Sequence, residues 1–241
     1  MKFETFIKSK KMDSANESQN EILKFKLIVV GDQNTGKSCI LNRFANEIFE
    51  ENYQATIGLD FLNKIVNING QEVHLVLYDT AGQEKFRSLI PMYIREAQII
   101  LLIYDITSKE SFESIPKWFS DILNVKNDEA IFALVGNKID LNDKRVVSFE
   151  EGKNLANEKN IIFEEVSAKD GQNFNELFSD KLFNELYKKF KNKFDNNNIR
   201  KKEQINNEYI EDNEISNNTN VKLELDGNNI NYQKKKKKKC C

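Results

Sequence analysis

The 241-residue sequence predicts an α/β fold whose mostly parallel sheet is covered by helices on both faces. Two observations favour this class. Apolar, β-branched runs that are typical of buried strands alternate with amphipathic segments of helical periodicity between about residues 24 and 194. In addition, the residues with recognisable chemistry come directly after the apolar runs. Ligands of such sheets bind at the carboxyl ends of the strands, so these residues are expected to share one site.

The first apolar run, at 25–30, is followed by a G-x-x-x-x-G-K-S phosphate-binding pattern, Gly31-Asp32-Gln33-Asn34-Thr35-Gly36-Lys37-Ser38. The glycines allow a tight turn whose N–H groups face an anion. Lys37 can reach the β- and γ-phosphates, and the Ser38 hydroxyl can bind Mg²⁺. The run at 39–45 has helical spacing, which would place a helix N-terminus under the phosphates. Because both flanks fit, we favour a P-loop over an ordinary glycine-containing turn.

The remaining elements complete a sheet of six strands. The runs at 59–68 and 73–78 flank Asn69-Gly70, a strong hairpin signal, so these strands are expected to be antiparallel neighbours. Further strands are predicted at 99–104, 131–135 and 161–166. Helices are predicted between them and after residue 173. Three side-chain caps are expected, from Thr107 with Glu110, from Ser148 with Glu151, and from Asn173.

The chain divides into three parts by composition. We expect a disordered arm at 1–23, one domain at 24–193, and a disordered tail at 194–241 that contains six consecutive lysines and ends in Cys240-Cys241. The net charge of −2 argues against a protein that binds nucleic acid over its whole surface. Three cysteines make no disulfide framework, which suits a reducing cytosol. No signal peptide or membrane-spanning run is recognisable.

A second motif, Asp79-Thr80-Ala81-Gly82-Gln83-Glu84, follows the run at 73–78. A carboxylate at a strand end can hold Mg²⁺, usually through water, so Asp79 has the position of a Walker-B residue. The backbone N–H of Gly82 could sense a γ-phosphate, and Gln83 could orient an attacking water.

Two further motifs predict the base that is bound. Asn137-Lys138-Ile139-Asp140 follows the run at 131–135, and Ser167-Ala168-Lys169 follows the run at 161–166. The Asp140 carboxylate can accept from both the ring N1–H and the exocyclic amine of guanine, a donor pair that adenine lacks. The Ala168 N–H can donate to the guanine O6. Together the motifs predict GTP rather than ATP as the ligand.

The P-loop, Thr56, D-T-A-G-Q-E, N-K-I-D and S-A-K together resemble the small Ras-like GTPases. The terminal Cys-Cys and the string Tyr53-Gln54-Ala55-Thr56-Ile57-Gly58 are similar to the Rab family. Arg87-Ser88-Leu89-Ile90-Pro91 is most similar to its sixth-numbered subgroup, which is associated with Golgi traffic. The resemblance covers about residues 24–191 and the last two residues.

The resemblance implies a P-loop NTPase fold, with one antiparallel edge strand in the sheet, and a role for each matching residue. The implied nucleotide-binding residues are Gly31, Asn34, Thr35, Gly36, Lys37, Ser38, Cys39, Phe49, Tyr53, Thr56, Gly82, Asn137, Lys138, Asp140, Ser167, Ala168 and Lys169. The implied Mg²⁺ ligands are Ser38 and Thr56, with Asp79 acting through water, and the implied catalytic residue is Gln83. The effector-facing residues would be Phe61, Tyr78 and Tyr93, and the lipidated residues Cys240 and Cys241.

The resemblance also implies a slow GTP hydrolase whose switch loops, 46–59 and 79–95, are held by the γ-phosphate. Gln33 stands where Ras proteins have Gly, and bulk there can crowd the γ-phosphate. Because the similar Rab subgroup also has Gln, slow hydrolysis is expected rather than an inactive enzyme. Tyr78 stands where Rab proteins usually have Trp. The arginines at 43, 87 and 95 are expected to be surface or structural residues.

The implied partners are GTP and GDP, effectors, an exchange factor, an activating protein, an escort protein and a GDP-dissociation inhibitor. Two geranylgeranyl chains would anchor a monomer to the cytoplasmic face of Golgi or transport-vesicle membranes, with a cytosolic pool when GDP is bound. No nucleic-acid partner is expected. Two alternatives remain open. One is a GTP-loaded scaffold without meaningful hydrolysis, and the other is a nuclear-transport GTPase or nucleic-acid binder that uses the lysine run.

Overall fold

The computed structural model describes residues 22–49, 59–80, 90–126 and 130–199. Their sheet has six strands in the order β2-β3-β1-β4-β5-β6. The strands are β1 (Leu23–Val30), β2 (Leu59–Ile68), β3 (Gln71–Thr80), β4 (Ile99–Asp105), β5 (Ile131–Asn137) and β6 (Ile162–Val166). The edge strand β2 pairs antiparallel with β3, and the four other pairings are parallel. The predicted fold class is therefore confirmed.

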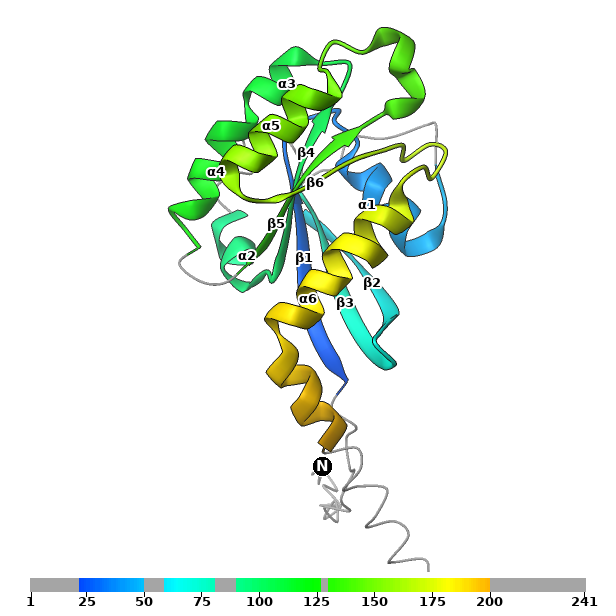
Figure 1. Ribbon diagram of the computed structural model, residues 1–241, viewed down its shortest axis with the longest axis vertical. Helices are drawn as coiled ribbons and strands as arrows, with labels where there is room; N and C mark the ends of the chain where they lie inside the picture. The colour runs from blue at the N-terminus through cyan, green and yellow to red at the C-terminus, as the bar shows by residue number, and fades with distance from the viewer. Residues whose placement is uncertain (1–21, 50–58, 81–89, 127–129, 200–241) are drawn as a thin grey trace, which may run out of the picture. The chain divides into compact units, whose positions relative to one another are not determined.

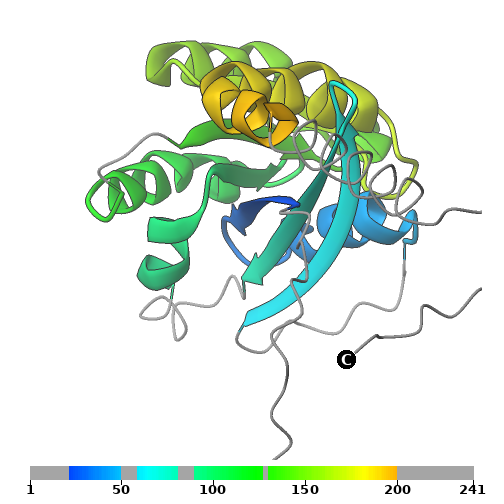
Figure 2. The same cartoon turned by 90° about the horizontal axis from the view of Figure 1, so that it is seen from below.

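Helices cover both faces of this sheet (Figure 1). They are α1 (Lys37–Asn46), α2 (Ile90–Glu96), α3 (Lys109–Glu113), α4 (Ile115–Leu123), the 3-10 helix η2 (Ile139–Lys144), α5 (Phe149–Lys159), the π-helix η3 (Glu176–Phe183) and α6 (Asn184–Lys189). One core cluster joins α1, η3 and α6 to the sheet, and the other joins α2, α4 and α5 to its opposite face. In Figure 2, α2 and α4 lie on one side of the strands and α1 on the other. No helix in the described part of the chain is both long and apolar enough to cross a membrane.

The turn and cap predictions have mixed outcomes. The β2–β3 turn has positive φ at Asn69 (50°) and Gly70 (80°), as the Asn-Gly hairpin signal predicts. The capping box at the start of α5 is present, with Ser148 and Glu151 as its partners. The cap predicted at Thr107 is wrong, because Ser108 caps α3 through the Ser111 N–H. Thr107 donates both its N–H and its hydroxyl to Asp105 Oδ1 instead.

The last predicted cap is also only half right. The Asn173 carbonyl accepts the Leu177 N–H, which starts the C-terminal helical segment where it was expected. The Asn173 side chain, however, donates to the Glu165 carbonyl at 2.7 Å. It therefore joins this segment to the end of β6.

The folded domain extends beyond residue 193, the end predicted for it. Residues 191–199 form a further helical segment, and the compact unit ends at Asn198. Phe194 is fully buried and stacks on Phe25 at 5.7 Å between ring centroids. Its carbonyl accepts from Gln71 Nε2 at 2.9 Å, and Asn197 Nδ2 donates to Gln71 Oε1 at 3.1 Å. The composition changes near residue 192, but the first aromatic residue after that change still belongs to the core.

Replacing Phe194 with Ala is expected to lower the free energy of unfolding by about 3 kcal/mol, because it empties a fully buried ring site. Chemical denaturation of the full chain measures this loss. Phe61→Ala is the matched control, since Phe61 is 60% exposed and its truncation leaves no cavity. Equal stability of the Phe194→Ala variant and the wild type would place residue 194 outside the core.

Candidate functional site

The P-loop is a tight turn that only glycine permits at its two ends. Gly31 and Gly36 have φ values of 142° and 88°, and Asn34 between them has a φ of 63°. A Cβ at Gly31 would clash with the Ile103 carbonyl oxygen of β4, and one at Gly36 would clash with the Asn137 amide. The turn therefore packs directly against the ends of two neighbouring strands, and α1 begins immediately after it.

Lys37 is the buried cation of this turn. The residue is 5% exposed, and its Nζ donates to the Asp32 carbonyl at 2.6 Å. Burial lowers the pKa of Lys37 to about 8, while the negative charges of Asp79 and Asp32 oppose this shift. Because burial leaves the ammonium poorly solvated, a nearby phosphate would strongly stabilise its charged form.

Asn137 joins the three predicted motifs. Its side chain is 1% exposed, donates through Nδ2 to the Thr35 carbonyl at 2.9 Å, and accepts the Ala168 N–H through Oδ1 at 3.2 Å. The P-loop, N-K-I-D and S-A-K are therefore adjacent at the carboxyl ends of their strands. The Ala168 N–H, predicted to meet guanine O6, is engaged by Asn137 in this arrangement, and its contact with guanine stays a prediction.

The carboxylate predicted to read guanine is held by the S-A-K loop. Ser167 donates its hydroxyl to Asp140 Oδ1 at 2.8 Å, and the same hydroxyl accepts the Asp170 N–H at 3.0 Å. Lys138 has a φ of 73° and forms an ion pair with Asp105 Oδ2 at 2.6 Å. Lys138 and Asp140 are thus each held by a residue outside the N-K-I-D motif.

Most of the other predicted residues fall into two groups. Ser38 and Cys39 are half-buried in the first turn of α1, Asp79 is buried near the end of β3, and the half-buried Phe49 follows α1 and packs against the core. The second group lies outside the described residues, and its predicted roles stay predictions: Tyr53, Thr56, Gly82, Gln83, Cys240 and Cys241.

Two residues that hold the site together, Asp105 and Arg43, belong to none of the predicted motifs. Asp105 ends β4 and holds Lys138, so the strand-end rule that identified the other motifs also applies to it. Arg43 was expected to be a surface or structural residue, and it is structural. It donates to the carbonyls of Ala168 at 2.9 Å and Lys169 at 2.5 Å, which ties α1 to the S-A-K loop.

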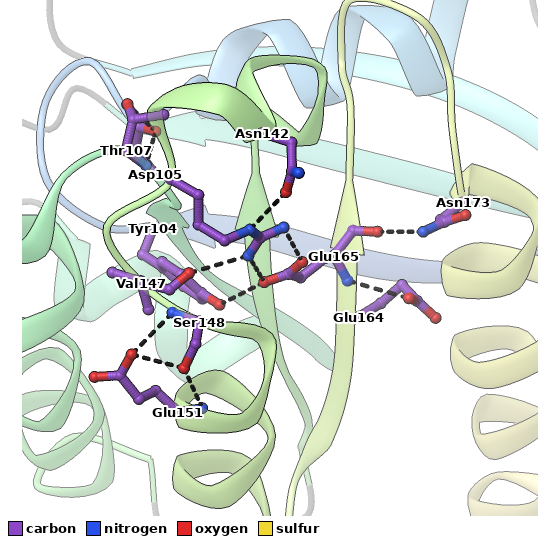
Figure 3. A network of polar contacts seen from close by, with 11 residues as sticks. Tyr104, Asp105, Thr107, Asn142, Val147, Ser148, Glu151, Glu164, Glu165 and Asn173 are labelled. Carbon is purple, nitrogen blue, oxygen red and sulfur yellow. Dashed lines mark hydrogen bonds and ion pairs between the residues drawn. The ribbon is translucent and has the colours of Figure 1, made fainter.

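An ion pair joins the segment after N-K-I-D to the strand before S-A-K (Figure 3). Arg145 follows η2 and donates to both carboxylate oxygens of Glu165 at 2.7 and 2.8 Å, while its Nε donates to Asn142 Oδ1. Glu165 is 4% exposed and lies two residues before Ser167. Burial, with the nearby Glu165 carboxylate, raises the pKa of Tyr104 well above its usual range, so that Tyr104 stays neutral beside this pair.

Arg145→Ala is expected to lower the free energy of unfolding by about 3 kcal/mol, because it leaves the buried Glu165 carboxylate without its cation. Lys188→Ala is the control, since it removes the cation of an exposed pair with Glu185 and is expected to cost less than about 1 kcal/mol. Urea denaturation of both variants tests the difference. Similar midpoints would show that the Arg145–Glu165 pair contributes no more than a surface pair.

A family comparison agrees with this geometry. Residues 26–188 match the model of the Ras family. The match includes the P-loop, the N-K-I-D and S-A-K motifs, all of β5 and β6, and β1 from residue 26 onward. Ras-family proteins are small GTPases that bind GTP and GDP and act as switches. The geometry and the match lead to one conclusion: the chain belongs to the Ras family of small GTPases.

Proposed function

We propose that this GTPase is a Rab-type switch that hydrolyses GTP slowly and recruits effectors for vesicle traffic, at membranes related to the Golgi. The observation that carries the proposal is an aromatic surface on the β2–β3 strand pair and α2. Phe61 lies opposite Tyr78 in the antiparallel register, and the rings of Tyr78 and Tyr93 are 5.2 Å apart. These three residues match the aromatic positions that Rab proteins present to their effectors.

The exposure of this surface supports docking of a protein partner. Phe61 is 60% exposed and Ile65 is 61% exposed, and residues at this spacing on a strand share one face. Exposed aromatic and aliphatic side chains in a group are typical of protein-binding surfaces. The Lys26 ammonium lies over the Tyr78 ring, 6.0 Å from its centroid, and pairs with Glu96, so charged residues border the surface.

The donor set fits Mg²⁺ as the cofactor. Ser38 supplies a hydroxyl oxygen and Asp79 a buried carboxylate, and hard oxygen ligands are those that Mg²⁺ prefers. Ras-family GTPases use Mg²⁺ together with the nucleotide, where the ion neutralises charge on the β- and γ-phosphate oxygens. Ser38, with Thr56, would hold it directly, and Asp79 would hold it through water.

The proposed switch depends on loops outside the described residues. Thr56 and Gly82 would hold them to the γ-phosphate, and Gln83 would orient the attacking water. Gln33 is exposed in the P-loop, where Ras proteins have Gly. We propose that the chain hydrolyses GTP slowly with Gln at this position. The tail would be geranylgeranylated at Cys240 and Cys241, with the six lysines adding attraction to an anionic leaflet.

A single-turnover assay of the GTP-loaded full chain tests the enzymatic part. Phosphate release is expected to be slow alone and roughly 10³–10⁵-fold faster with a Rab-activating protein. Gln83→Leu is expected to abolish most of that acceleration. Absence of phosphate release in both conditions would favour the GTP-loaded scaffold.

Localisation of the full chain with an N-terminal tag tests the membrane part. The wild type is expected on Golgi or vesicle membranes, and Cys240→Ser/Cys241→Ser in the cytosol. Unchanged membrane association of this variant would contradict the lipid anchor. Accumulation of the wild type in the nucleus would favour the nuclear-transport alternative.

A further inference from the structure

The second P-loop residue, Asp32, is a variable position of the phosphate-binding pattern, but it has specific partners in this chain. Ser114 donates its hydroxyl to Asp32 Oδ2 at 2.6 Å, and Trp118 donates its indole N–H to Asp32 Oδ1 at 2.8 Å. Both donors come from α4 and its N-cap, more than 80 residues later in the chain. The P-loop is therefore attached to a helix that carries none of the nucleotide-binding motifs.

The local geometry of α4 fixes these two donors. Ser114 is the N-cap residue and Trp118 lies four positions later, so both side chains lie on one helix face. The backbone N–H of Trp118 donates to the Ser114 carbonyl at 3.1 Å, which keeps this first turn regular. Trp118 is 4% exposed within the core cluster on that side of the sheet. Its indole N–H is thus held in place by packing.

The main chain of Asp32 has a second set of contacts. Its carbonyl accepts the Lys37 ammonium at 2.6 Å and the Thr35 hydroxyl at 2.9 Å. The Asp32 carboxylate also favours the charged form of Lys37. One residue therefore connects the α4 donors to the cation of the phosphate site.

We propose that Ser114 and Trp118 are positioning residues for nucleotide binding, and that Asp32 carries their effect to Lys37. They act through the shape of the P-loop turn rather than through contact with the nucleotide. The effect concerns the phosphate half of the site, because Lys37 and Thr35 belong to that half. The inference rests on nucleotide binding at the P-loop and is independent of the Rab-type role.

Release of mant-GDP from the Mg²⁺-loaded full chain tests this connection. Asp32→Ala, which removes both bonds, and Trp118→Phe, which removes one of them, are each expected to release the nucleotide about 3- to 10-fold faster, the effect of losing the net contribution of a typical hydrogen bond. The double variant is expected to be no faster than Asp32→Ala, because both changes remove the same bond. Ser114→Ala is expected to act in the same direction, and Ser120→Ala, on the exposed side of α4, is its matched control.

Two kinetic outcomes would overturn the proposal: release from Asp32→Ala within twofold of the wild type, or independent effects that multiply in the double variant. Failure of the wild type to bind mant-GDP would instead contradict nucleotide binding itself.

Trp118 also supplies a spectroscopic test, because it is the only tryptophan of the chain. Addition of GDP to nucleotide-free protein is expected to change its emission, since phosphate gives Lys37 a new partner beside the Asp32 carbonyl. The change is expected to disappear in Asp32→Ala and to persist in Ser120→Ala. A purely structural role for the Trp118–Asp32 bond would leave the response of Asp32→Ala equal to that of the wild type, and this result would overturn the proposal.

Discussion

Lys37→Met is expected to reduce GDP affinity at least 100-fold, the largest effect of any single substitution at the phosphate site. Hydrogen bonds from a charged donor contribute about 1.5–3 kcal/mol each, and the ammonium, which has three N–H donors, can donate to two oxygens of the β-phosphate of GDP. Met retains much of the buried aliphatic volume of the 5% exposed Lys37 side chain, so the domain is expected to stay folded. Titration with mant-GDP measures the loss of affinity, and circular dichroism verifies the fold. An affinity within tenfold of the wild type would show that Lys37 does not contact the phosphates.

The pH dependence of the wild type follows from the same residue. The pKa of Lys37 falls to about 8 in the folded protein from an ordinary value of 10.5, because burial disfavours the charge. Between these values the unfolded chain binds more protons, so the contribution of Lys37 to the stability of the nucleotide-free domain rises with pH. A phosphate favours the charged ammonium, so the nucleotide is bound with proton uptake above about pH 8.

GDP affinity is therefore expected to fall as pH rises above about 8, by at most about tenfold per pH unit, since one proton is involved. The Lys37→Met variant is the control, because it has no proton to take up at this position. Its GDP affinity is expected to be low and to lack the decrease above about pH 8. An identical pH profile in the two proteins would assign the dependence to another group.

The sequence predicted which motifs lie side by side where each motif ends a strand. Gly31, Asn137 and Ser167 each come at or just after a strand end, and parallel strands bring such residues together without any further information. The supporting contacts were not predictable in this way. Asp32 and Arg145 depend on partners far along the chain, and a sequence pattern does not show which distant side chain a residue will meet.

The same distinction applies to the fold. The strands, the Asn69–Gly70 turn and the box at Ser148 depend on local patterns, and all of them were predicted correctly. The cap at Thr107 failed because the Asp105 side chain competes for its hydroxyl and N–H. The domain boundary failed because Phe194 is a single aromatic residue in a polar segment, and composition averages over such a residue.

Asp140→Asn is expected to change base preference from guanine to xanthine. The carboxylate is predicted to accept from two guanine donors, whereas an amide presents one acceptor and one donor. Xanthine has a carbonyl where guanine has the exocyclic amine, so it matches the amide, and guanine would place its amine against an N–H donor. Loss of one charge-assisted bond and the unpaired donor together predict at least a 100-fold loss of GDP affinity, at about 1.5–3 kcal/mol each. XDP is expected to bind the variant more tightly than GDP does.

The contacts of Asp140 indicate that its replacement leaves the phosphate half intact. Ser167 Oγ bonds the Asp140 side chain at 2.8 Å and can donate to the amide oxygen of Asn as well. Asp143→Asn is the matched control, because Asp143 is an exposed carboxylate on the same 3-10 helix. Competition of GDP and XDP against mant-GDP is to be measured for both variants. Retained preference of Asp140→Asn for GDP would show that another group reads the base, and altered preference of Asp143→Asn would show that η2 as a whole, rather than one carboxylate, sets the choice.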